Sequence, residues 1–155
     1  MNQPTSSIIV EALSSYSSED AAAIGRLLPS LSHTFDGSPV DAQTLSDIIT
    51  SPYHQQFVAR DHRGAVIGTA TVSVTMGAGV ARGAWLEDFV VSSGAQGTGV
   101  GGKLWDEIIK WCQEKDAHKL DFTSRPSKEA AQTFYLKRGA IIRDTNYFRK
   151  VIDTE

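Results

Sequence analysis

The spacing of hydrophobic and polar residues in the first third of the chain predicts one strand and two helices. Residues 8–13, which are β-branched at their start, indicate a strand, and apolar residues then recur at every third or fourth position between 18 and 28, as on the buried face of a helix. A second helix is predicted over residues 38–50, because Ser38 is a favourable N-cap and Pro39 suits the first helical position.

The middle of the chain changes to the two-residue period of strands. Residues 56–60 and 65–74 flank a glycine-containing turn at 61–64, which predicts a β-hairpin. In the second of these strands, apolar residues alternate with Thr and Ser, so one face is expected to be dry and the other partly polar. A further strand is predicted over residues 83–91.

The last third of the chain combines two helices with two short strands. A helix that starts near Gly101 is followed by a strand at 118–123, by a helix capped by Ser127, and by a last strand at 146–152. Gly139 stands where the C′ glycine of the second of these helices is expected. The order of elements, β-α-α-β-β-β-α-β-α-β, predicts an α+β fold with a mixed central sheet and one βαβ step.

Composition limits the class of protein. With 155 residues, 41% of them hydrophobic, the chain has the size and apolar content of a single domain spanning residues 1–155. The formal net charge of -3 argues against a nucleic-acid partner, which would require a basic surface. No apolar run approaches membrane-spanning length, and a single cysteine without a secretion signal favours a reducing, cytoplasmic location.

The most informative segment is the glycine-rich stretch 96–102, Gln-Gly-Thr-Gly-Val-Gly-Gly, between a predicted strand and a predicted helix. Glycines let consecutive backbone N–H groups turn toward one point, and the positive end of the helix dipole adds to their attraction for an anion, so a pyrophosphate site is expected. The same glycines satisfy the G-x-G-x-x-G pattern of dinucleotide-binding proteins, with Asp121 at a suitable distance, but too little chain follows for that fold.

Two motifs make residues 85–150 resemble the GNAT superfamily of acetyl-CoA-dependent N-acetyltransferases, in particular a branch of its small members. Residues 96–101, after a Val-Val strand, match the family's pyrophosphate motif, and residues 131–139 are similar to its Ala-x-x-Phe-Tyr-x-x-x-Gly helix with the alanine one place late. The resemblance implies a GNAT-like sheet with helices on both faces. It also implies transfer of an acetyl group from acetyl-CoA, the co-substrate, directly to a primary amine.

The resemblance further implies which residues bind acetyl-CoA. The fourth strand of the family splays from the fifth, so main-chain N–H groups near Phe89, Val90 and Val91 are expected to hold the pantetheine arm and the thioester carbonyl. The glycine loop is expected to hold the pyrophosphate through Gln96, Gly97, Thr98, Gly99, Val100, Gly101 and Gly102.

Three side chains are candidates for the proton transfers of such a reaction. Glu87 and Asp88 lie on opposite faces of their strand by the two-residue period, so one of them can face the acceptor amine as general base. Either can be that base, the resemblance favours Glu87, and the alternative for each is a structural carboxylate. Tyr135 resembles the family's thiolate acid, with a core aromatic beside Phe134 as the alternative.

The acceptor and the partners are less constrained by the sequence. A small-molecule amine is favoured over a peptide amine, because no extended acidic groove is evident, and a homodimer is an option for the assembly. Loops 30–37 and 76–82 are expected to frame the acceptor pocket. Trp85, interpreted as a packing aromatic, could lie at the edge of this pocket.

The four histidines lack ligand spacing, so no metal site is predicted. The alternative functions are a non-catalytic acyl-CoA-binding or interaction module and a dinucleotide-binding oxidoreductase.

Overall fold

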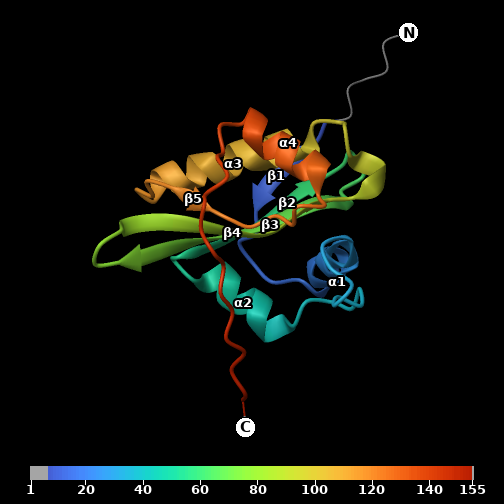
Figure 1. Ribbon diagram of the computed structural model, residues 1–155. Helices are drawn as coiled ribbons and strands as arrows, with labels where there is room; N and C mark the ends of the chain where they lie inside the picture. Colours follow the sequence, from blue (N-terminus) through green and yellow to red (C-terminus); the bar gives the residue numbers. More distant parts are fainter. Residues whose placement is uncertain (1–6, 155) are drawn as a thin grey trace. The chain divides into compact units, whose positions relative to one another are not determined.

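The computed structural model describes residues 7–154, which form two compact units divided between residues 122 and 123. The first unit contains a five-stranded sheet whose strands neighbour one another in chain order (Figure 1). Neighbouring strands are antiparallel, except that the fourth and fifth are parallel. The strands are β1 (Ile9–Ala12), β2 (His54–Arg60), β3 (Val66–Gly77), β4 (Ala81–Val91) and β5 (Leu120–Asp121).

Helices of the first unit cover both faces of this sheet (Figure 1). α3 (Val100–Glu114) packs on one face, called here the α3 face. α1 (Ser18–Leu27) and α2 (Ala42–Thr50) pack on the other, called the α1–α2 face. Because α3 connects the parallel strands β4 and β5, the predicted βαβ step is present, and the predicted α+β class with a mixed sheet is confirmed.

The α3 face of the sheet is apolar and comes very close to its helix. Leu104 and Ile108 of α3 are fully buried, and Cys112 lies in the same core, as predicted. Gly68 of β3 makes the close approach possible, because a Cβ atom there would lie 3.0 Å from Leu104 Cδ1 and 3.2 Å from Val100 Cγ1. A larger residue at this position would require the Leu104 and Val100 side chains to shift.

The α1–α2 face combines an apolar cluster with a polar stripe. The buried apolar residues that join the two helices to the sheet are Leu13, Ala21, Ile24, Leu45 and Val58. Val58 of β2 pairs with Thr69 of β3, so Thr69 and Thr71 project from this same face by the two-residue period. Both threonines are nevertheless buried, so their hydroxyl groups must find partners inside the protein.

The two helices on this face begin at side-chain caps. The side chain of Ser17 accepts a hydrogen bond from Asp20 N at 3.1 Å and caps α1. The predicted cap of α2 at Ser38 is wrong, because the N-cap residue is Asp41. Val40 N donates to Ala21 O at 3.0 Å, which ties this part of the chain to α1 before the helix can start.

The second unit contains α4 (Glu129–Lys137), which carries Phe134 and Tyr135. The helix is followed, as predicted, by Gly139 with a φ of +87°. Its start differs from the prediction, because the N-cap residue is Lys128 rather than Ser127 and makes no side-chain cap bond. Lys128 N donates to Arg125 O at 2.9 Å, so a turn occupies residues 125–128 and the helix begins after it.

The strand predicted over residues 146–152 is wrong. Residues 140–154 form no helix and pair with no strand in the structure. Aromatic and β-branched residues favour an extended backbone, but a strand also needs the hydrogen bonds of a neighbouring strand. The residue pattern of one segment does not specify such a neighbour, so the pattern alone overstated the strand.

Candidate active site

The glycine-rich segment 96–102 forms the end of the connection from β4 to α3. Gly97 and Gly99 have φ values of +78° and +92°, a region that glycine enters without steric cost. Gly99 is also the N-cap residue of α3 and has no side chain that could bond the first N–H groups of the helix. A glycine-dependent loop at a helix N-terminus is therefore present, as the sequence predicts.

Several backbone N–H groups of this loop have no acceptor within residues 7–154. The first hydrogen bond of α3 runs from Lys103 N to Gly99 O at 3.1 Å, so the N–H groups before it lie outside the helical pattern. The described chain also leaves the space beside Gly97 and Gly99 open, since no non-adjacent atom lies within 4 Å of the position of a Cβ there. The N–H groups able to meet an anion are those of Gly97, Gly99, Val100, Gly101 and Gly102.

Two other residues of the predicted cofactor set brace the loop. Gln96 donates from Nε2 to Val91 O at 3.3 Å, which links the loop to the end of β4. Thr98 donates to Ala95 O from its hydroxyl and, at 3.4 Å, from its backbone N. These bonds hold the loop in shape without occupying the N–H groups on its open side.

β4 extends well past its pairing with β5. The β4–β5 ladder consists of the pairs Ala84 with Leu120 and Trp85 with Asp121, and β5 ends there, whereas β4 continues to Val91. Phe89, Val90 and Val91 belong to this continuing part of the strand and lead into the connection to the glycine loop. β4 therefore has no β5 partner along residues 86–91, and the splaying of the two strands stays a prediction.

A β-bulge interrupts β4 at Asp88 and Phe89. Thr69 pairs with Val90 and Thr71 with Glu87, so two residues of β4 stand opposite Ala70 alone. Asp88 has a φ of +54°, a left-handed conformation that Asp adopts more readily than most residues. This bulge was not predicted, because the sequence of β4 does not alternate clearly enough for one extra residue to be recognised.

The bulge also changes the surroundings of the Asp88 carboxyl group. Its pKa is raised from the ordinary value, first because burial disfavours the charged form and second because the negative charge of Glu87 is close by. Glu87, in contrast, is exposed and pairs across the sheet with Thr71, so it projects from the α1–α2 face. The two carboxylates therefore occupy different environments, one exposed and one partly buried.

Trp85 and Glu87 form a hydrogen-bonded pair on the α1–α2 face. They lie two residues apart on β4 and pair with Ser73 and Thr71 of β3, so both project to the same side. Trp85 Nε1 donates to Glu87 Oε1 at 2.7 Å. A short bond from a neutral N–H to a carboxylate is among the stronger hydrogen bonds in proteins, so it restrains the Glu87 side chain.

A buried polar network lies beside this pair. Gln56 Nε2 donates to Thr69 Oγ1 at 2.7 Å, and Thr71 Oγ1 donates to Gln56 Oε1 at 2.7 Å. Thr69 Oγ1 in turn donates to Phe57 O at 2.8 Å, so the buried hydroxyl groups of both threonines are satisfied. The alternating threonines signalled a polar face in the sequence, but the partnership with Gln56 depends on strand register and was not predicted.

Tyr135, the predicted thiolate acid, lies on α4 of the second unit. Its ring meets that of Phe134 edge to face, with centroids 5.5 Å apart. Burial raises the pKa of Tyr135 to about 12, because the charged phenolate is disfavoured away from water. The phenol therefore keeps its proton at neutral pH, which is the state that a proton donor needs.

Other groups with reactive chemistry are placed in structural roles. Burial raises the pKa of the Cys112 thiol to about 11, so this core cysteine is not an activated nucleophile. Within residues 7–154, no cluster of three His, Cys, Asp or Glu side chains could hold a metal ion.

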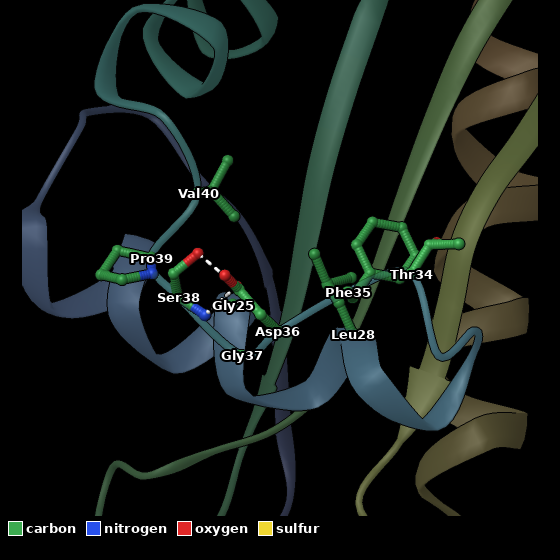
Figure 2. A pocket seen from close by; sticks show the side chains of 9 residues that line it. All are labelled: Gly25, Leu28, Thr34, Phe35, Asp36, Gly37, Ser38, Pro39 and Val40. Carbon is green, nitrogen blue, oxygen red and sulfur yellow. Dashed lines mark hydrogen bonds between the residues drawn. The ribbon is translucent and has the colours of Figure 1, made fainter.

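The loop between α1 and α2 encloses a hollow of about 300 Å³, also on the α1–α2 side of the first unit (Figure 2). Leu28, Thr34 and Phe35 gather at one end of it in Figure 2, and Ser38 and Pro39 at the other. Asp36 accepts hydrogen bonds from Ser38 N at 2.9 Å and from Ser38 Oγ at 2.5 Å. These bonds lower the pKa of the Asp36 carboxyl group, so the hollow contains an ionised carboxylate at neutral pH.

Comparison with protein families identifies the family of this chain. Residues 25–140 match the model of the acetyltransferase (GNAT) family, which is well over half of the chain. The chain therefore belongs to this family and is an acetyltransferase, and the resemblance seen in the sequence is confirmed. The family generally uses acetyl-CoA as its co-substrate, and a dinucleotide-dependent oxidoreductase is not consistent with membership in it.

Solved structures share the fold over almost the whole chain. An aminoglycoside acetyltransferase from an uncultured soil metagenomic sample is 18% identical with a TM-score of 0.75, over 94% of this chain and 97% of that chain. Glucosamine-6-phosphate N-acetyltransferase from Arabidopsis thaliana is 18% identical with a TM-score of 0.74, over 95% and 99%. An integron cassette protein from the mobile metagenome of V. cholerae is 21% identical with a TM-score of 0.69, over 94% and 93%.

None of the curated protein sequences is significantly similar to the chain. In the part of the chain from residue 7 to residue 154, no helix is both long and apolar enough to cross a membrane.

Proposed function

We propose that the chain transfers the acetyl group of acetyl-CoA directly to the primary amine of a small molecule, and that β4 aligns the two reactants. The observation that carries this proposal is the course of β4. The strand runs beyond its ladder with β5, leads into the glycine loop, and presents Glu87 on its α1–α2 face. A single strand thus joins an anion-binding loop to a carboxylate.

Acetyl-CoA supplies an acetyl group activated as a thioester. In this proposal the main chain of Phe89, Val90 and Val91 holds the pantetheine arm and the thioester carbonyl. The pyrophosphate is held by the N–H groups of Gly97, Gly99, Val100, Gly101 and Gly102, in the loop braced by Gln96 and Thr98. The open space beside the loop and the fixed direction of its N–H groups support this assignment, because preoriented donors need no reorganisation to bind an anion.

Glu87 is the proton acceptor in this proposal. The nitrogen of a protonated amine must lose a proton before it can bond to the acyl carbon, and a carboxylate within reach, or one water away, can take it. Glu87 is exposed on the α1–α2 face, so an acceptor can reach its carboxylate from solvent, which supports this role. Asp88 has a structural role in the bulge in this proposal. Its raised pKa, nearer to that of a useful base, keeps it as the alternative proton acceptor.

Tyr135 is the proton donor in this proposal. When the new C–N bond has formed, the nitrogen releases its second proton to solvent. The C–S bond breaks, the departing sulfur takes a proton from the Tyr135 hydroxyl, and solvent then reprotonates Tyr135. The phenol is fully protonated at neutral pH, as a proton donor must be, although a pKa of about 12 makes it a weaker acid than an exposed tyrosine.

The acceptor is proposed to be a cationic small molecule. Acidic side chains outnumber basic ones in residues 7–122, where the candidate base lies, whereas basic side chains outnumber acidic ones in residues 123–154. An excess of negative charge attracts amines that carry further positive charge. Aminoglycosides, named for one protein of the same fold, carry several amines and are therefore the first compounds to test, and glucosamine-6-phosphate, named for another, is the negatively charged comparison. A peptide amine, a homodimer, a single domain over residues 1–155 and a cytoplasmic location stay predictions.

Two measurements on the full chain test the proposal. Isothermal titration with acetyl-CoA is expected to show binding at one site per chain. Thiol release from acetyl-CoA, followed over a panel of aminoglycosides, amino sugars, polyamines and peptides, is expected to depend on a small-molecule amine. Binding without thiol release on any amine would favour a non-catalytic acyl-CoA-binding module instead.

A further inference from the structure

The bond between Trp85 and Glu87 determines which oxygen of the candidate base is accessible. Glu87 Oε1 accepts from Trp85 Nε1 at 2.7 Å, whereas Glu87 Oε2 accepts no hydrogen bond within residues 7–154. An exposed glutamate with three side-chain torsions would otherwise sample many positions, and holding it in one costs rotamer entropy. Trp85, with only two torsions, supplies a donor at a fixed place on the strand.

We propose that Trp85 is a positioning residue of this enzyme: its indole N–H holds Glu87 Oε1 so that Glu87 Oε2 points at the acceptor amine. This inference rests on the proposed function, in which Glu87 is the proton acceptor. The proton leaves the ammonium nitrogen of the acceptor for Glu87 Oε2 and passes from there to solvent. The nitrogen lone pair that it leaves behind becomes available for the acyl carbon.

The chemistry of indole suits this role better than that of other donors. The Nε1–H group donates but cannot accept, and it does not titrate in water. It therefore holds the carboxylate without competing for the proton that Glu87 takes. A lysine or arginine at position 85 would instead add a positive charge, which would repel a cationic acceptor.

The backbone beneath the pair is hydrogen-bonded to β3. Trp85 and Glu87 pair with Ser73 and Thr71 of β3, and Trp85 also pairs with Asp121 of β5, whereas Glu87 lies beyond that ladder and directly before the bulge. Both side chains thus stand on a stretch of strand in regular register with β3. Side chains on strands keep their geometry more precisely than side chains on loops. Because Trp85 stands on a strand, its hydrogen bond holds the Glu87 carboxylate in a defined position.

Substitution of Trp85 by Phe separates positioning from packing. Trp85→Phe keeps an aromatic ring and removes the N–H group, so kcat is expected to fall about tenfold, because a hydrogen bond to a charged group is lost, while KM for the amine changes little. Trp111→Phe is the matched control, since it makes the same change in the core of α3 and is expected to leave kcat and KM as they are. Loss of folding would appear in the circular dichroism of either variant.

A double-mutant cycle tests whether Trp85 acts through Glu87. In the Glu87→Gln background the carboxylate is already gone, so adding Trp85→Phe is expected to lower kcat no further. A merely structural role for Trp85 would lower kcat by the same factor in both backgrounds. Equal factors, or a Trp85→Phe enzyme as fast as the unsubstituted chain, would overturn the inference.

The contact also has a readout that needs no turnover. The indole N–H resonance of Trp85, identified as the one lost in Trp85→Phe, is expected to move upfield in Glu87→Ala, where its acceptor is removed. If that resonance does not move, the bond is absent in solution and the inference fails.

The failure of the inference can be told apart from the failure of the proposed function. If the unsubstituted chain acetylates no amine, both fail. If acetyl transfer depends on Glu87 but not on Trp85, only the positioning role of Trp85 is overturned.

Discussion

The two faces of the sheet in the first unit are built from different chemistry. On the α3 face, Gly68 lets an apolar helix approach the sheet, and the start of that helix turns its backbone N–H groups toward open space. On the α1–α2 face, side chains carry the chemistry: Trp85 holds Glu87 beside a buried network centred on Gln56. In the proposed site, the cofactor half therefore depends on main-chain geometry, whereas the acceptor half depends on particular side chains.

The largest effect is expected from removing the carboxylate on the α1–α2 face. Glu87→Gln keeps the shape of the side chain and removes its ability to take a proton, so kcat is expected to fall about a hundredfold in the thiol-release assay. Acetyl-CoA affinity, measured by calorimetry, should stay the same because the main-chain contacts are untouched. Asp88→Asn is the matched control, and a larger loss there than in Glu87→Gln would make Asp88 the base.

The next largest effect concerns the polar network. Gln56→Leu leaves the buried Thr71 hydroxyl group without its acceptor, so the free energy of unfolding is expected to fall by about 2 kcal/mol. Gln55→Leu is the control at the neighbouring position, which faces the α3 side and makes two long bonds of 3.4 Å. Urea denaturation measures both variants. Equal losses would mean that the network adds nothing beyond ordinary packing.

The glycine loop and the start of α3 could be predicted from the sequence because their determinants are local. Gly97 and Gly99 need positive φ values, and glycine in that context predicts both the turn and the helix start. The hairpin of β2 and β3 follows from two alternating runs around one turn for the same reason. The start of α2 was misplaced, since the bond from Val40 N to Ala21 O depends on a distant helix.

The acceptor half escaped prediction because it depends on pairing between distant segments. The bulge at Asp88 arises from the register of β3 against β4, and the Gln56 network arises from the register of β2 against β3. The strand predicted at residues 146–152 failed for a related reason, because its residues favour extension without identifying a partner. Glu87 was found as a candidate, but its bond to Trp85 was not.

A smaller effect is expected at the main-chain half of the site. Gly99→Val places a β-branched residue at a φ of +92°, and the open space around it means that the cost comes from the backbone rather than from a clash. Acetyl-CoA is expected to bind at least tenfold more weakly by calorimetry, about 1.4 kcal/mol. Tyr135→Phe supplies the contrast, with unchanged binding and slower turnover. Unaltered acetyl-CoA affinity in a folded Gly99→Val chain would remove the basis for the pyrophosphate assignment.

The smallest effect is expected at the bulge, where the main chain and the carboxylates meet. Asp88→Gly relieves a left-handed backbone that costs a non-glycine residue about 1–2 kcal/mol, but the added freedom of glycine in the unfolded chain costs roughly 0.5–1 kcal/mol. The two terms nearly cancel, so urea denaturation is expected to show little change in stability, and kcat should persist if Glu87 is the base. Asp88→Val, which is β-branched at the same φ of +54°, is expected to lose stability instead. A stable Asp88→Gly chain without activity would show that the Asp88 carboxylate takes part in the reaction, and that the side chain at the bulge matters for more than its backbone conformation.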